Sequence, residues 1–157
     1  MQWKKWLENW DMNSLKITAP FLEMEFKPQE ADKNAAWDLY IELLTRITTQ
    51  SLLREEGDEQ SALDSIYTIF NITREILKYH GRDAEIFARL AIVILNQIVR
   101  PFTAKWHKRA LAKAFQNKTE CKNFRKELQE LQVLLNIYME MLADMAGVED
   151  LTSLENI

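Results

Sequence analysis

The chain has few of the residues that build reactive or metal-binding sites. Its 157 residues include one cysteine, two histidines, three glycines and three prolines. Cys121 has no partner for an internal disulfide, and a single cysteine excludes a cysteine-rich metal site. Neither His80 nor His107 follows a glutamate at the spacing of a di-iron bundle. Three scattered glycines cannot build a phosphate-binding loop. We therefore expect no metal and no cofactor.

Long apolar runs are also missing. The longest run, residues 90–95, is far shorter than the roughly 20 residues that span a bilayer. Charged residues at positions 4, 5, 8 and 11 break up the start of the chain, which does not resemble a secretion signal. With 47% hydrophobic and 28% charged residues, the composition is typical of a soluble globular protein. We expect a cytoplasmic protein with no membrane span.

The remaining pattern predicts an all-α fold, a mostly antiparallel bundle of four or five helices over residues 30–147. Apolar residues recur at helical spacing in five segments, about 31–53, 58–80, 83–100, 102–115 and 117–147. Gly57, Gly81 and Gly147 each follow such a segment, where a glycine can close a helix. Pro101 is expected to end or kink the third helix, and it also suits the first turn of a fourth. Residues 148–157 are expected to form a tail.

The sequences of two of these helices predict where each helix lies in the bundle. The third is apolar almost all round, which places it in the middle of the bundle. The last begins at Asn117 with a capping-box-like pattern and carries a heptad stripe from Cys121 to Met145. The stripe either forms the inner face of the bundle or joins two copies of the chain in a homodimer.

The first 29 residues differ from the rest and are predicted to form an arm. Trp3, Trp6 and Trp10 share one face if this part is helical. Residues 22–27 alternate between apolar and charged side chains, which is typical of a strand. The alternation fits a short β-hairpin or a lone strand that pairs with a partner. The tryptophans would cover an end of the bundle, contact a partner protein, or lie on a membrane surface.

Positive charge is concentrated in one segment, residues 100–126. It has one acid, Glu120, and nine cations: Arg100, Lys105, Lys108, Arg109, Lys113, Lys118, Lys122, Arg125 and Lys126. Its net charge is +8 in a chain whose total is −4, so the rest carries −12. Such asymmetry attracts the phosphates of RNA or DNA, or an acidic protein partner. Trp106 could stack on unpaired bases beside these cations. The alternative without a binding function is a solvated helical hairpin whose charge keeps the protein soluble.

One catalytic pattern is present. Arginine followed by four to six residues and histidine resembles the motif of HEPN ribonucleases, small helical bundles that usually act as dimers. The pattern occurs twice, as REILKYH (74–80) and RPFTAKWH (100–107). On a helix, Arg74 and His80 point about 120° apart, whereas Arg100 and His107 share a face about 10 Å apart. The resemblance implies that Arg100 stabilises phosphate charge and His107 activates a ribose hydroxyl, without a metal.

A structural role for the same stretch is the competing interpretation. Arg100, with Asn96 and Gln97, could tie down the carbonyl groups freed by the Pro101 break. The stretches ADKNAAWDLYIELLTRITTQ and LNQIVRPFTAKWH resemble bacterial helical proteins. The leading hypothesis is a non-catalytic interaction module or accessory subunit of a bacterial cytoplasmic complex. The alternatives are a ribonuclease using Arg100 and His107, and a self-assembling helical scaffold.

Overall fold

The structure is a computed structural model that describes residues 27–46 and 59–151. The described residues are almost entirely helical and contain no strand, so the predicted all-α class is confirmed. The α-helices are α3 (Glu30–Leu44), α4 (Glu59–His80), α5 (Glu85–Ile94), α6 (Arg100–Leu111) and α7 (Lys118–Ala146). Two 3-10 turns, Gly81–Ala84 and Ala114–Gln116, and a π-helical segment, Leu95–Val99, join them. The arm over residues 1–29 falls mostly outside these ranges, including its proposed hairpin and Trp3, Trp6 and Trp10.

The number of helices is not confirmed. From Glu59 to Leu111 the chain is helical without an intervening loop, because α4, α5 and α6 are joined by the 3-10 and π segments. How many helices this stretch contains depends on how the 3-10 and π segments are assigned. The boundaries between the arm, the bundle and the tail are likewise not tested by the structure.

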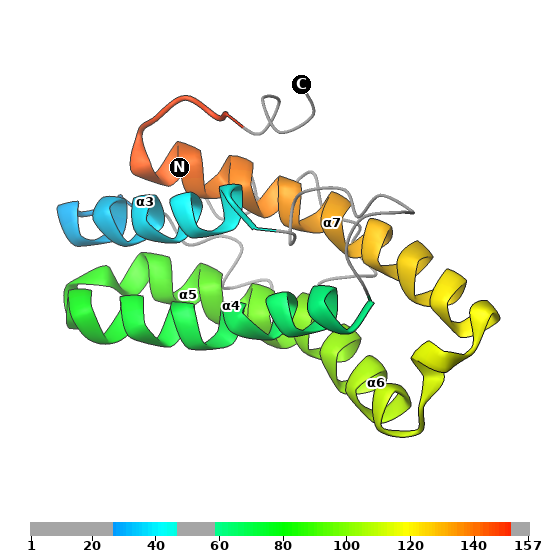
Figure 1. The fold of residues 1–157 in the computed structure, drawn as a ribbon. Coiled ribbons are helices and arrows are strands. Elements are labelled where there is room, and N and C mark those ends of the chain that lie inside the picture. Colours follow the sequence, from blue (N-terminus) through cyan, green and yellow to red (C-terminus); the bar gives the residue numbers. More distant parts are fainter. Residues whose placement is uncertain (1–26, 47–58, 152–157) are drawn as a thin grey trace.

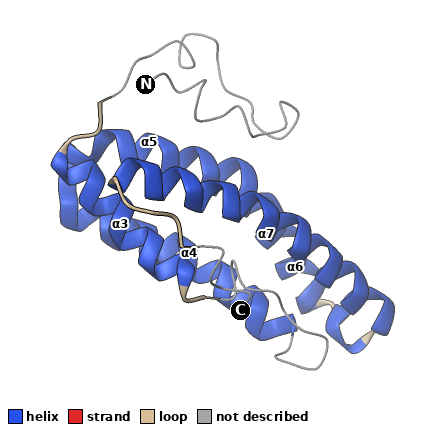
Figure 2. Ribbon diagram, turned by 90° about the horizontal axis from the view of Figure 1, so that it is seen from above, coloured by secondary structure: helices blue, strands red, loops and turns tan. Residues whose placement is uncertain are grey.

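The helices pack as a bundle with one projecting end (Figure 1). α3 lies along the carboxyl half of α7, and α4 and α5 run in opposite directions beneath them (Figures 1 and 2). Gly81, with a φ of +72°, provides the reversal between α4 and α5. At the other end, α6 and the first turns of α7 form a helical hairpin that extends beyond α3.

The core confirms the predicted inner face of the last helix. Phe124, Leu128, Leu135, Tyr138 and Leu142 of the heptad stripe are buried inside the single chain, and each contributes roughly 1.5–3 kcal/mol of burial energy. They meet buried residues of the other helices, which include Leu39, Leu43, Ile66, Ile69, Phe87, Leu90 and Ile94. The stripe is therefore occupied within the chain.

The third predicted helix is less central than its composition suggested. Phe87, Leu90 and Ile94 on α5 are buried, but Ile92 on the opposite face is 50% exposed. The expectation that this helix lies in the middle of the bundle is wrong for that face. In the described part of the chain α3 packs against α5, and the face that carries Ile92 is left exposed.

The same region bears on membrane insertion. The helical stretch Glu59–Leu111 includes an 18-residue window with a mean hydropathy of 1.4, apolar enough to cross a membrane by length and composition alone. However, 44% of that window is buried inside the molecule, and the core helix of a soluble protein passes the same test. This is weak evidence either way, so the absence of a membrane span stays a prediction.

Candidate functional site

The basic segment forms the helical hairpin of α6 and α7. Pro101 lies in the first turn of α6, where its missing N–H costs no hydrogen bond. The π segment just before Pro101 keeps the backbone helical up to the proline, because the Arg100 N–H donates to the Leu95 carbonyl five residues back. Helix α6 ends at Leu111, and Lys113 adopts a left-handed conformation with φ of 63°. The Asn117 side chain then accepts hydrogen bonds from the N–H groups of Thr119 and Glu120, which starts α7 as predicted.

Trp106 is the internal anchor of the hairpin. Its side chain is fully buried, with its ring stacked on Phe115 at 6.1 Å and edge-on to Phe124 at 5.2 Å between centroids. The indole N–H donates to Glu127. The expectation that Trp106 stacks on bases is wrong for this conformation, because hydrophobic burial and this hydrogen bond hold the ring inside.

Three of the nine cations form ion pairs with carboxylates. Lys105 pairs with Glu127, Arg109 with Glu120 at 3.3 Å, and Arg125 with Glu59 at 2.8 Å. The Lys105 ammonium and the Arg109 guanidinium also lie over the Trp106 ring, at 5.4 and 5.2 Å from its centroid. These three cations brace the hairpin and are less available to a ligand than the sequence suggested.

Two of the neutralising acids could not be recognised in the basic segment. Glu127 stands one residue beyond it, and Glu59 precedes Arg125 by 66 residues. Helical spacing alone would place Glu127 near other α7 residues, but only the fold shows that it faces Lys105 and Trp106 on α6. No local signal pairs Glu59 with Arg125.

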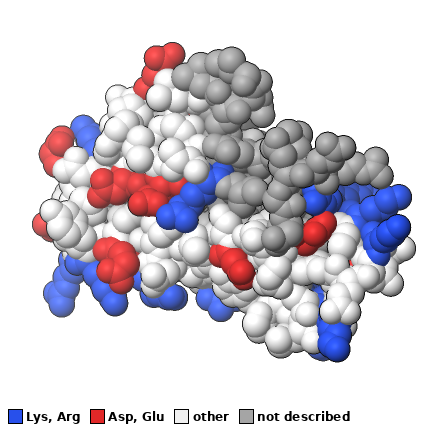
Figure 3. Space-filling view, viewed as in Figure 1, with Lys and Arg blue, Asp and Glu red and all other residues white. Residues whose placement is uncertain are grey.

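Of the six cations that remain, five are exposed lysines, and we call these five the lysine tip. They are Lys108, Lys113, Lys118, Lys122 and Lys126. Within the described ranges none of them forms an ion pair. Lys118, Lys122 and Lys126 follow one another at four-residue steps, about 6 Å apart along one side of α7. Figure 3 shows Lys and Arg side chains gathered at the projecting end of the molecule.

Arg100 and His107 both lie toward α4. The Arg100 guanidinium covers the Phe70 ring at 5.3 Å from its centroid, and its Nε donates to the Asn96 side chain at 3.3 Å. The His107 ring meets Tyr67 edge-on at 5.7 Å between centroids. The two residues therefore share a helix face, as predicted, but each contacts a different aromatic ring.

His107 lines a cavity of about 530 Å³ between α4 and α6. A cavity with a larger volume, about 690 Å³, lies elsewhere, between α3 and α4. The lining of the His107 cavity comprises Gln60, Leu63, Asp64, Tyr67, His107, Ala110 and Leu111, and Arg100 is not among them. The Tyr67 hydroxyl donates to the Thr103 carbonyl at 3.3 Å, which holds α4 against α6 beside this cavity. The arrangement exposes His107 to a ligand but does not bring Arg100 to the same place.

The structural role expected for Arg100 needs correction. It does not tie down loose carbonyls at a proline break, because the π segment lets the helix continue through Pro101. Its described partners are the Asn96 side chain and Phe70. The other motif histidine, His80, bonds to Asp38 at 2.7 Å across α3 and α4, while Arg74 is exposed.

Metal and thiol chemistry find no support in the described residues. Within these ranges, no three His, Cys, Asp or Glu side chains gather as a metal site would require. Cys121 lies between Phe115 and the Glu59–Arg125 pair, and its thiol donates to the Phe115 carbonyl at 3.3 Å. Burial, followed by the Glu59 charge, raises the pKa of this thiol, which disfavours the reactive thiolate.

Comparison of the chain with protein-family models, with curated proteins and with solved structures found no match.

Proposed function

We propose that the protein is a non-catalytic interaction module that binds nucleic acid through the lysine tip. The observation that carries this proposal is the separation of charge within the hairpin. Arg109, Arg125 and Lys105 are paired with carboxylates, whereas five lysines at the projecting end are exposed and without ion pairs among the described residues. Flexible ammonium groups in such a cluster suit the phosphate backbone of RNA or DNA.

Burial of Trp106 limits what kind of binding this can be. Without that ring, the hairpin has no exposed tryptophan to stack on bases. We therefore expect binding to be governed by phosphate charge, with little sequence preference and a steep dependence on salt. We propose that the protein is an accessory subunit of a bacterial cytoplasmic complex and that it folds as a four- or five-helix bundle.

The experiment is a titration of labelled single-stranded RNA and double-stranded DNA at several salt concentrations, with EDTA present. Replacing Lys118, Lys122 and Lys126 with glutamine should weaken binding. For duplex DNA, the slope of log K against log salt should fall by about 2.7 if each lysine neutralises one phosphate. Replacing Lys27, Lys33 and Lys78 with glutamine removes the same charge elsewhere and should leave the slope nearly unchanged.

The outcome also separates an acidic protein partner from nucleic acid. If neither RNA nor DNA binds, but polyglutamate binds and the lysine-tip variant abolishes that binding, the hairpin docks on acidic protein surfaces. Equal loss in the tip and control variants would contradict any localised site.

A metal-independent ribonuclease is the second candidate function, favoured by the exposure of His107 at a cavity. In that case the RNA in the same titration is cleaved despite EDTA. His107→Ala should abolish the cleavage without lowering the melting temperature. Arg100→Lys should also lower the rate of RNA cleavage, because a lysine cannot hold phosphate in two parallel hydrogen bonds.

Self-assembly into a homodimer is the third candidate function. Since the heptad stripe is buried within the chain, a homodimer would use other surfaces, and truncation of residues 1–29 should dissociate it. Sedimentation of the full and truncated chains distinguishes the two states.

A further inference from the structure

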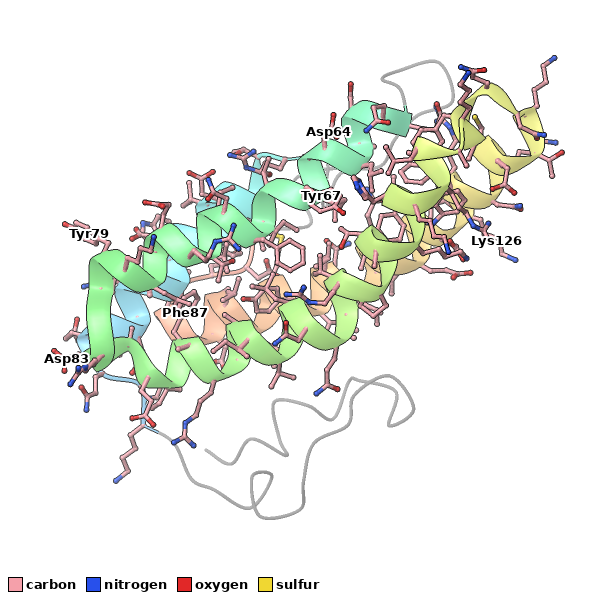
Figure 4. All side chains as sticks on the ribbon, turned by 90° about the horizontal axis from the view of Figure 1, so that it is seen from below. Asp64, Tyr67, Tyr79, Asp83, Phe87 and Lys126 are labelled. Carbon is pink, nitrogen blue, oxygen red and sulfur yellow. The ribbon has the colours of Figure 1, made fainter. Side chains whose placement is uncertain are left out.

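A second cavity lies away from the lysine tip, between α3 and α4. It has a volume of about 690 Å³. Its lining comprises Trp37, Asp38, Ile41, Glu42, Asn71, Ile72, Glu75, Ile76 and Tyr79. Tyr79 and Lys126 lie at opposite ends of the molecule (Figure 4), so this groove is a separate surface from the proposed nucleic-acid interface.

The lining of this α3–α4 groove includes apolar side chains from both helices, and three of them remain on the surface: Trp37, Ile41 and Tyr79. Trp37 and Ile41 are one helical turn apart on α3, with 41% and 38% of each side chain exposed. On α4, Ile72 is half-buried and Ile76 is buried in the core, whereas Tyr79, at the end of the groove, is 84% exposed. Single exposed apolar residues are ordinary, but several around one groove are typical of an interaction site.

The charged residues of the groove are all acidic. Asp38 and Glu42 line it from α3 and Glu75 from α4, and no lysine or arginine is among the lining residues. Arg46 bonds to Glu42 at 2.8 Å from beyond the groove, and His80 bonds to Asp38 at 2.7 Å. Glu75 is exposed and forms no ion pair among the described residues. Figure 3 shows acidic side chains over α3 and α4 on this face, on either side of uncharged surface.

The length of the groove suggests the shape of its occupant. Asn71 to Tyr79 covers eight steps along α4, about 12 Å of helix axis or two helical turns. An amphipathic helix seated between two helices presents apolar anchors at positions i, i+4 and i+7 over such a distance. Carboxylates on both walls favour lysine or arginine beside those anchors.

We propose that the α3–α4 groove binds a basic amphipathic helix of another protein. Its apolar side chains rest on Trp37, Ile41 and Tyr79, and its cations face Asp38, Glu42 and Glu75. This surface is independent of nucleic-acid binding and would let the protein join a protein partner to a polyanion bound at the other end.

The test uses a fluorescein-labelled peptide of leucine and lysine, about 14 residues or four helical turns long, with its leucines on one face. Anisotropy with the full chain should show saturable binding. A peptide of the same composition in scrambled order, and one with glutamate in place of lysine, should bind at least about tenfold more weakly.

The matched variants are Ile41→Lys in the groove and Val133→Lys on an exposed part of α7. Both replace an exposed apolar residue with a cation, so they change net charge equally. Ile41→Lys should weaken binding about tenfold or more, because it removes an anchor and repels the peptide, and Val133→Lys should change it less than about twofold. If Ile41→Lys fails to fold by circular dichroism, Glu75→Lys reverses an exposed wall charge and should give the same loss.

Three results would overturn the proposal. The scrambled or glutamate peptide could bind as well as the basic helix, or Val133→Lys could weaken binding as much as the groove variants. The peptide could also bind only after Trp3, Trp6 and Trp10 are replaced with serine. That last result would assign the groove to the chain's own first residues instead of a partner.

Discussion

The Asp32 carboxylate near the start of α3 accepts a hydrogen bond from the backbone N–H of Phe87, at 2.9 Å, in the first turn of α5. Its second oxygen accepts the N–H of Gln29 at 2.8 Å. Asp32 is buried, and the residue before α5, Ala84, has no side chain that could cap that helix. One carboxylate thus satisfies N–H groups at the starts of two helices and holds those ends together.

Asp32→Ala should lower the free energy of unfolding by about 3 kcal/mol, because it leaves two N–H groups without their acceptor. Glu30→Gln is the matched control, since Glu30 belongs to the same first turn of α3 but is exposed. It should change the free energy of unfolding by no more than about 0.5 kcal/mol. Urea unfolding followed by circular dichroism measures both. Equal effects would mean that the charge near the helix end matters and the two hydrogen bonds do not.

Two buried tyrosines should respond in opposite directions to the same substitution. The Tyr40 hydroxyl donates to Asp150 at 3.0 Å and accepts from the Leu151 N–H. The Tyr138 hydroxyl is buried without a hydrogen-bond partner. Tyr40→Phe should therefore lower the free energy of unfolding by about 1–2 kcal/mol, and Tyr138→Phe should raise it by about 1 kcal/mol. Thermal melting of the two variants decides this, and a loss in both would show that the Tyr138 hydroxyl is hydrogen-bonded in solution.

How far the sequence predicts the fold depends on how local the interaction is. Gly147 ends α7 as expected, with φ of 72°, because the left-handed turn after a helix favours glycine. Asn117 starts α7 for an equally local reason. Asp32 gave no such signal, since its partner Phe87 is 55 residues away.

For the candidate site too, the sequence predicts local features but not long-range packing. Clustering of the lysines could be counted in the sequence, but burial of Trp106 could not. A tryptophan among cations fits both a base-stacking surface and the underside of a hairpin. Only packing against Phe115 and Phe124 distinguishes the two. The sequence could not predict the α3–α4 groove, because the helical periodicity does not distinguish the exposed Ile41 from the buried Ile76.

Lys113 links stability and binding in one residue. It holds a left-handed backbone conformation with φ of 63°, which costs a non-glycine residue roughly 1 kcal/mol. Lys113→Gly should therefore raise the free energy of unfolding by up to about 1 kcal/mol, reduced by the greater freedom that glycine gives the unfolded chain. It should also weaken nucleic-acid binding, because it removes one cation of the lysine tip.

Lys113→Ala is the control, since it removes the same charge and keeps the strain. It should weaken binding equally without gaining stability. Melting curves and the salt titration together test this. A stability gain in both variants would attribute the effect to relief of charge repulsion among the lysines.

The last prediction concerns the Cys121 thiol, whose pKa is raised chiefly by burial and then by the Glu59 charge, against the lowering effect of Arg125. The folded chain therefore holds the thiol proton more tightly than the unfolded chain does. This contribution to stability is fully present below the unfolded pKa of about 9 and is lost as pH rises above it. Alkylation by iodoacetamide at pH 8 should be slower in the folded protein than in urea, where the thiol is exposed.

Glu59→Gln separates charge from burial. It removes a carboxylate that raises the thiol pKa and leaves Arg125, which lowers it, without its ion-pair partner. The pH profile of alkylation in the folded protein should therefore shift to lower pH, whereas Glu30→Gln, remote from the thiol, should leave it in place. If Glu59→Gln does not move the profile, restricted access to the half-buried sulfur governs its reactivity, and the carboxylate contributes little.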